Sequence, residues 1–168
     1  MPAADTTAGA RRPAVPARLL RDPLCLLALG FGAGLSPYAP GTAGTLLAVP
    51  LYLLLADLPL TVYAAVLGAA FILGVVVCGH AGRRLGVPDH PAIVWDEITG
   101  FGIAMLGAPS GWGWVAAGFV LFRCFDILKP WPIFWMDRAM KGGWGVMLDD
   151  VIAALYAYAC IKLISYLL

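Results

Sequence analysis

An uncharged, apolar stretch from Pro59 to Cys78 constrains the fold of this chain more than any other feature. Its length matches the ~20 helical residues that cross the hydrocarbon core of a bilayer. Of the 168 residues, 61% are hydrophobic and only 12% are charged, which leaves too little polar surface to cover a water-soluble protein of this size. The chain is therefore predicted to be an integral membrane protein.

Further apolar segments follow a helical pattern and are separated by turns rich in Pro, Gly and Asp. Helices are expected near residues 44–56, 59–79, 92–108, 112–128 and 147–168. Before them, Leu24–Gly34 is too short to span and runs into Gly34–Thr45, a Gly/Pro-rich segment typical of a re-entrant or interfacial element. The expected fold class is all-α, a polytopic transmembrane helical bundle of about four to five spans.

The N-terminal segment differs in composition from the rest of the chain. Residues 1–22 are rich in Ala, Pro, Thr and Arg and lack apolar periodicity, so we expect a disordered N-terminal tail there and a membrane domain over 23–168. A net charge of +1 argues against a nucleic-acid binder, which carries a basic stripe. The four cysteines stand singly in apolar segments, without the spacing of a zinc or redox site.

The charged residues are predicted to gather on one side of the bilayer. If Gly41 begins on the cytoplasmic side, the alternation of helices places Arg83 and Arg84 inside and Asp57 outside, as the positive-inside rule requires. The same alternation brings six acids from different segments to the cytoplasmic face: Asp96, Glu97, Asp126, Asp137, Asp149 and Asp150. This convergence is the main indication of function.

Asp96 and Glu97 stand in an apolar helical stretch, where an uncompensated carboxylate costs at least ~2.5 kcal/mol on insertion scales. An ion pair with Arg or Lys near the interface would offset that cost, and so would a divalent cation. Mg²⁺ takes hard oxygen ligands from one or two carboxylates and completes its shell with water and phosphate. We favour the metal, because ionisable residues within membranes are usually functional.

Arg123, Asp126 and Lys129 are spaced by three residues, so a helix would place them on one face. They form either a salt-bridge ladder at a helix end or a metal ligand flanked by two phosphate-binding cations. Asp149 and Asp150 follow a glycine-rich segment at the expected start of the last helix. There they either bind metal or only complement the helix dipole.

Two other patterns bear on phosphate chemistry. Gly34–Thr45 offers unhindered backbone N–H groups and the hydroxyls of Thr42 and Thr45 where a helix begins, which can hold a phosphate, although the segment could also merely break the helix. Cys78 and Arg84 have the C-x5-R spacing of cysteine phosphatases. We regard that match as accidental, because those loops follow a strand and Cys78 ends an apolar helix.

Several separated motifs, in this order, resemble the phosphatidylglycerophosphatase A family of bacterial membrane enzymes: PYAPGTAGT, VWDEITGF, FRCFDILKPWPI, MDR and GGWGVMLDD. The resemblance covers roughly Phe31 to Leu155. It implies Mg²⁺-dependent hydrolysis of the terminal phosphate of phosphatidylglycerophosphate, a phospholipid substrate, at the cytoplasmic face of the bacterial inner membrane. Nothing in the sequence indicates an obligate protein partner.

The resemblance also implies a set of site residues. The family's acidic motif positions correspond to the six acids named above, and its basic positions correspond to Arg123, Lys129 and Arg138. We expect Asp96, Glu97 and one or two of Asp126, Asp149 and Asp150 to hold the metal, and a remaining acid to orient water. The basic residues, with Thr42 and Thr45, are expected to bind phosphate. Direct hydrolysis and an aspartyl-phosphate intermediate both stay open.

The alternative function is a small membrane transporter that uses intramembrane charges as an ion relay. That function predicts charges spread through the depth of the bundle, often with a repeated half, and the sequence shows no internal repeat. A CDP-alcohol phosphotransferase also clusters aspartates in a membrane, but its D-x2-D-G-x2-A-R pattern is missing.

Overall fold

The computed structural model describes residues 15–133, 135, 140 and 142–168, and within them every regular element is a helix. The elements, in chain order, are η1 (Ala17–Arg21), α1 (Pro23–Ala28), η2 (Gly30–Leu35), α2 (Pro40–Leu55), α3 (Leu60–Leu85), α4 (Trp95–Ala104), α5 (Trp112–Leu128) and α7 (Gly143–Leu167). The predicted all-α class is therefore confirmed for this part of the chain. The number of spans stays a prediction.

One helix of the described part, α3, is long and apolar enough to cross a membrane by itself. Its most apolar window has a mean hydropathy of 2.5, and only 17% of that window is buried within the protein. A core helix of a water-soluble protein would be mostly buried, so the exposed apolar surface of α3 needs another apolar surrounding. Helix α2 is apolar but shorter.

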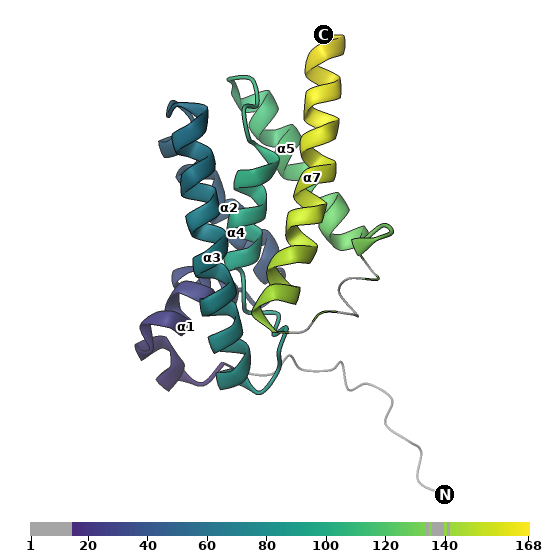
Figure 1. Ribbon diagram of the computed structural model, residues 1–168. Coiled ribbons are helices and arrows are strands. Elements are labelled where there is room, and N and C mark those ends of the chain that lie inside the picture. The colour runs from purple at the N-terminus through teal and green to yellow at the C-terminus, as the bar shows by residue number, and fades with distance from the viewer. Residues whose placement is uncertain (1–14, 134, 136–139, 141) are drawn as a thin grey trace, which may run out of the picture.

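Helix α4 occupies the centre of the bundle, with α2 and α3 on one side and α5 and α7 on the other (Figure 1). The main core forms around it from Phe101, Met105, Phe122 and Ile161, all at most 1% exposed. The short α1 packs instead beside the C-terminal half of α3. Helix α4 has ten residues and carries the carboxylates Asp96 and Glu97 in its first turn.

The helix ends follow local rules. Asp22 caps α1 by accepting hydrogen bonds from the N–H groups of Leu24 at 3.0 Å and Cys25 at 3.4 Å. Proline occupies the first position of α1 and of α2, where a missing N–H costs nothing. Gly86 ends α3 in the left-handed conformation, with a φ of 75°.

The predicted helices occur close to their expected ranges, with shifted ends. Helix α2 begins at Pro40 instead of residue 44, and α3 continues to Leu85 instead of residue 79. Of the predicted tail, residues 1–14 lie outside the described residues. Order begins before residue 22, because η1 buries Leu19 at 2% exposure.

Candidate active site

Three carboxylates from two helices converge at one end of the bundle. Asp96 and Glu97 lie in the first turn of α4, and Asp150 lies in the second turn of α7. One oxygen of each carboxylate lies within 4.8 Å of the other two. Asp96 is 7% exposed and Asp150 is 3% exposed, so the cluster is shielded from solvent. We call these three residues the acid cluster.

The acid cluster carries buried oxygens that lack hydrogen-bond partners among the described residues. These atoms are Asp96 Oδ1, Glu97 Oε2 and Asp150 Oδ2, one from each member. A buried carboxylate without compensation is costly, and three together repel one another. A divalent cation would offset both effects, and an all-oxygen donor set suits hard cations such as Mg²⁺. The residues present therefore fit a metal ion.

Two basic residues lie at the edge of the acid cluster. Arg123, on α5, lies 3.9 Å from Glu97 and donates a short hydrogen bond to Asp126 one turn further along the helix. Lys129 Nζ donates to Asp149 Oδ2 at 2.6 Å. Asp126 also lies beside Asp150. The arrangement therefore joins acids of α4, α5 and α7 through two cations that can also reach a bound anion.

The N-terminus of α2 approaches this site through Gly41. A Cβ atom at position 41 would lie 2.3 Å from Glu97 Oε1 and 3.1 Å from both Nη atoms of Arg123. The N–H groups of Gly41 and Thr42 belong to the first turn of α2, where no intrahelical acceptor is available. A helix N-terminus next to a guanidinium group is a favourable place for a phosphate.

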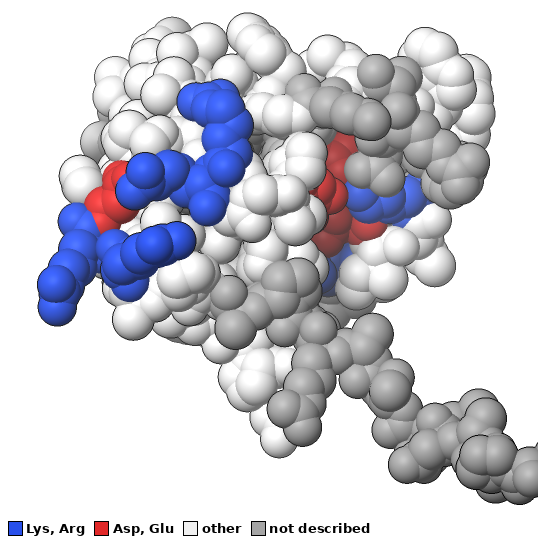
Figure 2. All heavy atoms as spheres, turned by 90° about the horizontal axis from the view of Figure 1, so that it is seen from below, with Lys and Arg blue, Asp and Glu red and all other residues white. Residues whose placement is uncertain are grey.

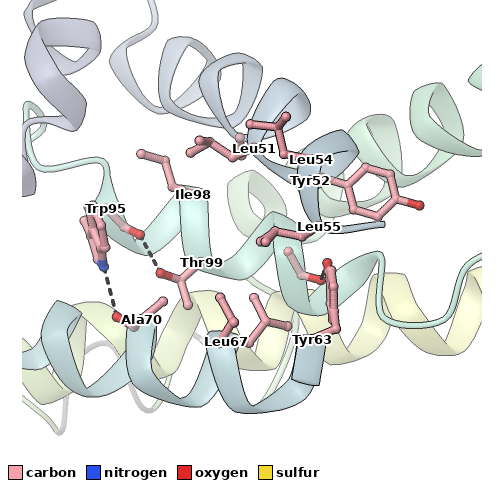
Figure 3. A pocket seen from close by; sticks show the side chains of 13 residues that line it. Leu51, Tyr52, Leu54, Leu55, Tyr63, Leu67, Ala70, Trp95, Ile98 and Thr99 are labelled. Atoms are coloured by element: carbon pink, nitrogen blue, oxygen red, sulfur yellow. Dashed lines mark hydrogen bonds between the residues drawn. The ribbon is translucent and has the colours of Figure 1, made fainter. Parts of the chain in front are cut away.

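Helix α4 turns its opposite face to an apolar pocket of about 200 Å³ between α2 and α3 (Figure 3). The polar groups on its wall are satisfied internally: Trp95 Nε1 donates to the carbonyl of Ala70 at 3.0 Å, and the Thr99 hydroxyl donates to the carbonyl of Trp95 at 2.9 Å. None of the described residues that line this pocket is charged, a histidine or a cysteine. Seen from the charged end, the acidic side chains lie in a hollow flanked by basic ones (Figure 2).

Comparison with known proteins identifies the family. The sequence profile of phosphatidylglycerophosphatase A matches residues 26–165. This chain belongs to the phosphatidylglycerophosphatase A family. The resemblance inferred from the motifs is thus confirmed.

Two members of the family with this name, and a third relative, match this chain over most of its length. It is 44% identical to phosphatidylglycerophosphatase A of Escherichia coli (strain K12) over 148 residues, 88% of this chain and 86% of the relative. It is also 44% identical to phosphatidylglycerophosphatase A of Haemophilus influenzae, over 88% of this chain and 91% of the relative. A candidate phosphatidylinositol-3-phosphatase of Bacteroides thetaiotaomicron is 39% identical over 85% of this chain and 94% of the relative. No solved structure matches significantly.

The predicted residues of this family member fall into three groups. Asp96, Glu97 and Asp150 form the acid cluster, and Asp126, Asp149, Arg123 and Lys129 surround it. Asp137 and Arg138 lie outside the described residues. Thr42 lies in the first turn of α2, whereas the buried Thr45 hydroxyl donates to the carbonyl of Gly41 at 2.9 Å, which uses its only proton.

The geometry bears on three of the alternatives that the sequence leaves open. Helix α7 begins at Gly143, so Asp149 and Asp150 lie beyond the first turn, where a helix dipole has little effect. Helix α5 ends at Leu128, so Lys129 lies beyond the helix on which the ladder is predicted, and it pairs with Asp149 of α7. Cys78 is fully buried inside α3 and contacts Met147, as expected if its spacing to Arg84 is accidental.

Sequence reasoning missed the importance of Gly41 to this site. The proline–glycine pair at positions 40 and 41 indicates a helix start, but no sequence signal says which side chains the glycine must accommodate. Contact with Glu97 and Arg123 appears only when α2, α4 and α5 are packed together.

Proposed function

We propose that this protein is a phosphatidylglycerophosphatase, which hydrolyses the terminal phosphate of phosphatidylglycerophosphate to give phosphatidylglycerol and inorganic phosphate. Family membership supports this reaction, and the single structural observation that carries the mechanism is the acid cluster with its three unpartnered, buried oxygens. Bound at these oxygens, Mg²⁺ would neutralise charge on the phosphate and polarise its phosphorus–oxygen bonds.

The basic groups around the acid cluster bind the phosphate in this proposal. A phosphomonoester dianion repels an incoming nucleophile, so catalysis depends on neutralising its oxygens and holding water in line. Arg123 can donate to two phosphate oxygens at once, and the N–H groups of Gly41 and Thr42 lie in the helix turn beside it. Lys129 adds a further charge while Asp149 fixes its position.

Asp126 is our candidate for orienting the attacking water. It is outside the acid cluster yet beside Asp150, and Arg123 holds one of its oxygens. Water adds to phosphorus and gives a proton to Asp126 while the bond from phosphorus to the glycerol oxygen breaks. Asp126 then returns that proton to the glycerol oxygen, directly or through a water molecule, and is ready for the next turnover. The second carboxylate that could do this, Asp149, is engaged by Lys129.

The location that we propose is the bacterial inner membrane, with several membrane spans and the acid cluster on the cytoplasmic face. The apolar surface of α3 supports contact with lipid, and Arg83 and Arg84 in its last turn support a cytoplasmic location for that end. Among the described residues, the charged side chains that lie away from this end of the bundle are Asp57 and Lys162. An ion relay through the bundle would require charges at intermediate depth, so the transporter function is disfavoured.

Phosphate release from phosphatidylglycerophosphate in detergent micelles, with Mg²⁺ or with excess EDTA, tests the proposal. We expect release by the wild type only with Mg²⁺, loss of more than about 100-fold in Asp150→Asn, and normal release by Asp57→Asn, an exposed acid at the other end of the bundle. Absence of release by a folded wild type refutes the function. Release that continues in excess EDTA would support the hydrolase function but contradict the requirement for a metal ion. Phosphatidylinositol 3-phosphate, tested in parallel, measures selectivity.

A further inference from the structure

Four exposed arginines form a second charged surface, separate from the acid cluster. Arg18 and Arg21 lie in the last turn of η1, and Arg83 and Arg84 lie in the last turn of α3. Figure 2 shows a basic area on the same face as the acidic hollow but apart from it. We call these four residues the arginine patch.

Tertiary packing creates the arginine patch, because its two halves are more than sixty positions apart in the sequence. Cys25 and Ala28 of α1 are buried against Val77, Cys78 and Ala81 of α3, and the buried Leu19 of η1 joins the same apolar group. This packing holds the end of η1 against the end of α3. The fold thus gathers like charges that would otherwise repel and separate.

One aspartate anchors the patch without neutralising it. Asp22 Oδ2 lies 2.8 Å from His80 Nε2 and 3.8 Å from Arg84 Nε, while Oδ1 caps α1. The hydrogen bond from His80 lowers the pKa of the Asp22 carboxyl below its ordinary value, so this group is ionised at neutral pH. Four arginines less one aspartate leave a surplus of three positive charges on these elements, histidine not counted.

The donor atoms at this place also suggest a metal, but the charges argue against one. Asp22, Cys25 and His80 bring a carboxylate oxygen, a thiol and an imidazole nitrogen within 4.8 Å of one another. The four guanidinium groups around them repel a divalent cation and attract an anion. Guanidinium also matches phosphate geometry, since its planar fork donates two parallel hydrogen bonds.

We propose that the arginine patch binds the headgroups of anionic phospholipids in the leaflet that borders the charged end of the bundle. The patch lies at the C-terminal end of α3, the helix long enough to span, and in a bilayer that end would lie at the level of the phospholipid phosphates. Anionic lipids then gather on the face where the acid cluster opens. This inference needs the membrane location but goes beyond the hydrolytic reaction.

Lipid selectivity, measured without turnover, tests the inference. The purified protein is reconstituted in phosphatidylcholine bilayers with spin-labelled phosphatidylserine or spin-labelled phosphatidylcholine, and the motionally restricted fraction of each label is compared by electron paramagnetic resonance. Each arginine near an anionic surface increases the binding constant for that surface by about fivefold. We therefore expect a clear preference for phosphatidylserine, which weakens at high NaCl concentration because salt screens the charges.

Two matched quadruple variants decide the role of charge. Arg18→Gln/Arg21→Gln/Arg83→Gln/Arg84→Gln is expected to reduce the preference to a ratio of about one, whereas the four Arg→Lys substitutions keep most of it. A Gln variant that retains the wild-type ratio overturns the proposal. So does a Lys variant that loses the preference as fully as the Gln variant, or a wild type that shows no preference for phosphatidylserine. Phosphate release from micellar substrate by the Gln variant should stay normal, which separates this test from that of the proposed function.

Discussion

Replacing Gly41 with alanine tests whether the contact between α2 and the acid cluster matters for chemistry. The added Cβ would lie 2.3 Å from Glu97 Oε1, and ordinary contact begins at 3.4 Å, so the oxygen must move by 3.4 − 2.3 = 1.1 Å. Arg123, at 3.1 Å from the same point, must move by about 0.3 Å (3.4 − 3.1). The two groups predicted to bind metal and phosphate are therefore displaced together.

The magnitude of the Gly41→Ala effect follows from this displacement. A shift of about 1 Å in a catalytic group can reduce the rate by about 100-fold. Folding should suffer little, because both neighbours are the ends of flexible side chains and alanine favours a helix by up to ~1 kcal/mol over glycine. We expect phosphate release to fall by about 100-fold while the melting temperature in detergent stays near that of the wild type.

A matched glycine provides the control for Gly41→Ala. A Cβ atom added at Gly68, within α3, would meet no other atom within 4 Å, so Gly68→Ala should keep full activity. The double variant Gly41→Ala/Glu97→Gln should lose less activity than the product of the two single losses, because both changes act mainly on the Glu97 carboxylate. Near-normal turnover by folded Gly41→Ala would refute the assignment of this contact to the site.

Three further predictions address the metal, the ion pair and the packing. Mg²⁺ at 100 times its Kd should stabilise the wild type by about 2.7 kcal/mol in thermal unfolding, and an equal shift in Asp150→Asn would contradict binding at the acid cluster. Lys129→Met should reduce stability by about 2 kcal/mol in chemical unfolding, because the buried Asp149 loses its lysine; an unchanged midpoint would show that this pair contributes nothing. Gly143→Ala places a Cβ 1.9 Å from the carbonyl oxygen of Val75, so we expect a cost of about 3 kcal/mol or more; a melting temperature like that of wild type would mean that α7 and α3 separate easily.

The helical class and most helix positions could be predicted because the hydrophobic pattern is strong. The uncharged stretch from Pro59 to Cys78 lies entirely within α3 except for its first residue, which caps the helix. The N-terminal elements could not be predicted in the same way. Asp22 caps α1 and binds His80, a residue far away in the sequence, and Leu19 is buried in the same apolar group as residues of α3, so both contacts depend on tertiary packing.

The last helix begins earlier than its sequence predicts because packing overrides local propensity. Glycine-rich sequence usually indicates a loop, yet Gly143 and Gly145 are helical residues of α7 and both are buried. Gly143 has no side chain because α3 passes too close for one. The end of α5, by contrast, follows from the sequence, because Pro130 disfavours a helical conformation in the residue before it, Lys129. A helical salt-bridge ladder from Arg123 through Asp126 is therefore not expected to continue to Lys129.

The candidate site could be predicted as a set of residues but not as a geometry. Order along the chain and the alternation of helices correctly bring Asp96, Glu97 and Asp150 together. The sequence order does not say which acids belong to the acid cluster and which pair with a base. Asp149 and Asp150 are neighbours in sequence, yet they contact different partners. Lys129 engages Asp149, whereas Asp150 faces α4.

The glycines around α4 explain how acids of different helices come close to one another. A Cβ at Gly100 would lie 2.7 Å from the ring of Phe122 and 3.4 Å from Cβ of Asp150, so α5 and α7 can approach α4 only because this residue has no side chain. Gly44 plays the same part toward Val94, at 2.7 Å. Alanine at Gly100 should thus separate the acid-bearing helices, and alanine at Gly44 should move α2 away from the start of α4, whereas alanine at Gly68 should do neither. A series of such variants would show whether activity falls with the displacement that each Cβ imposes.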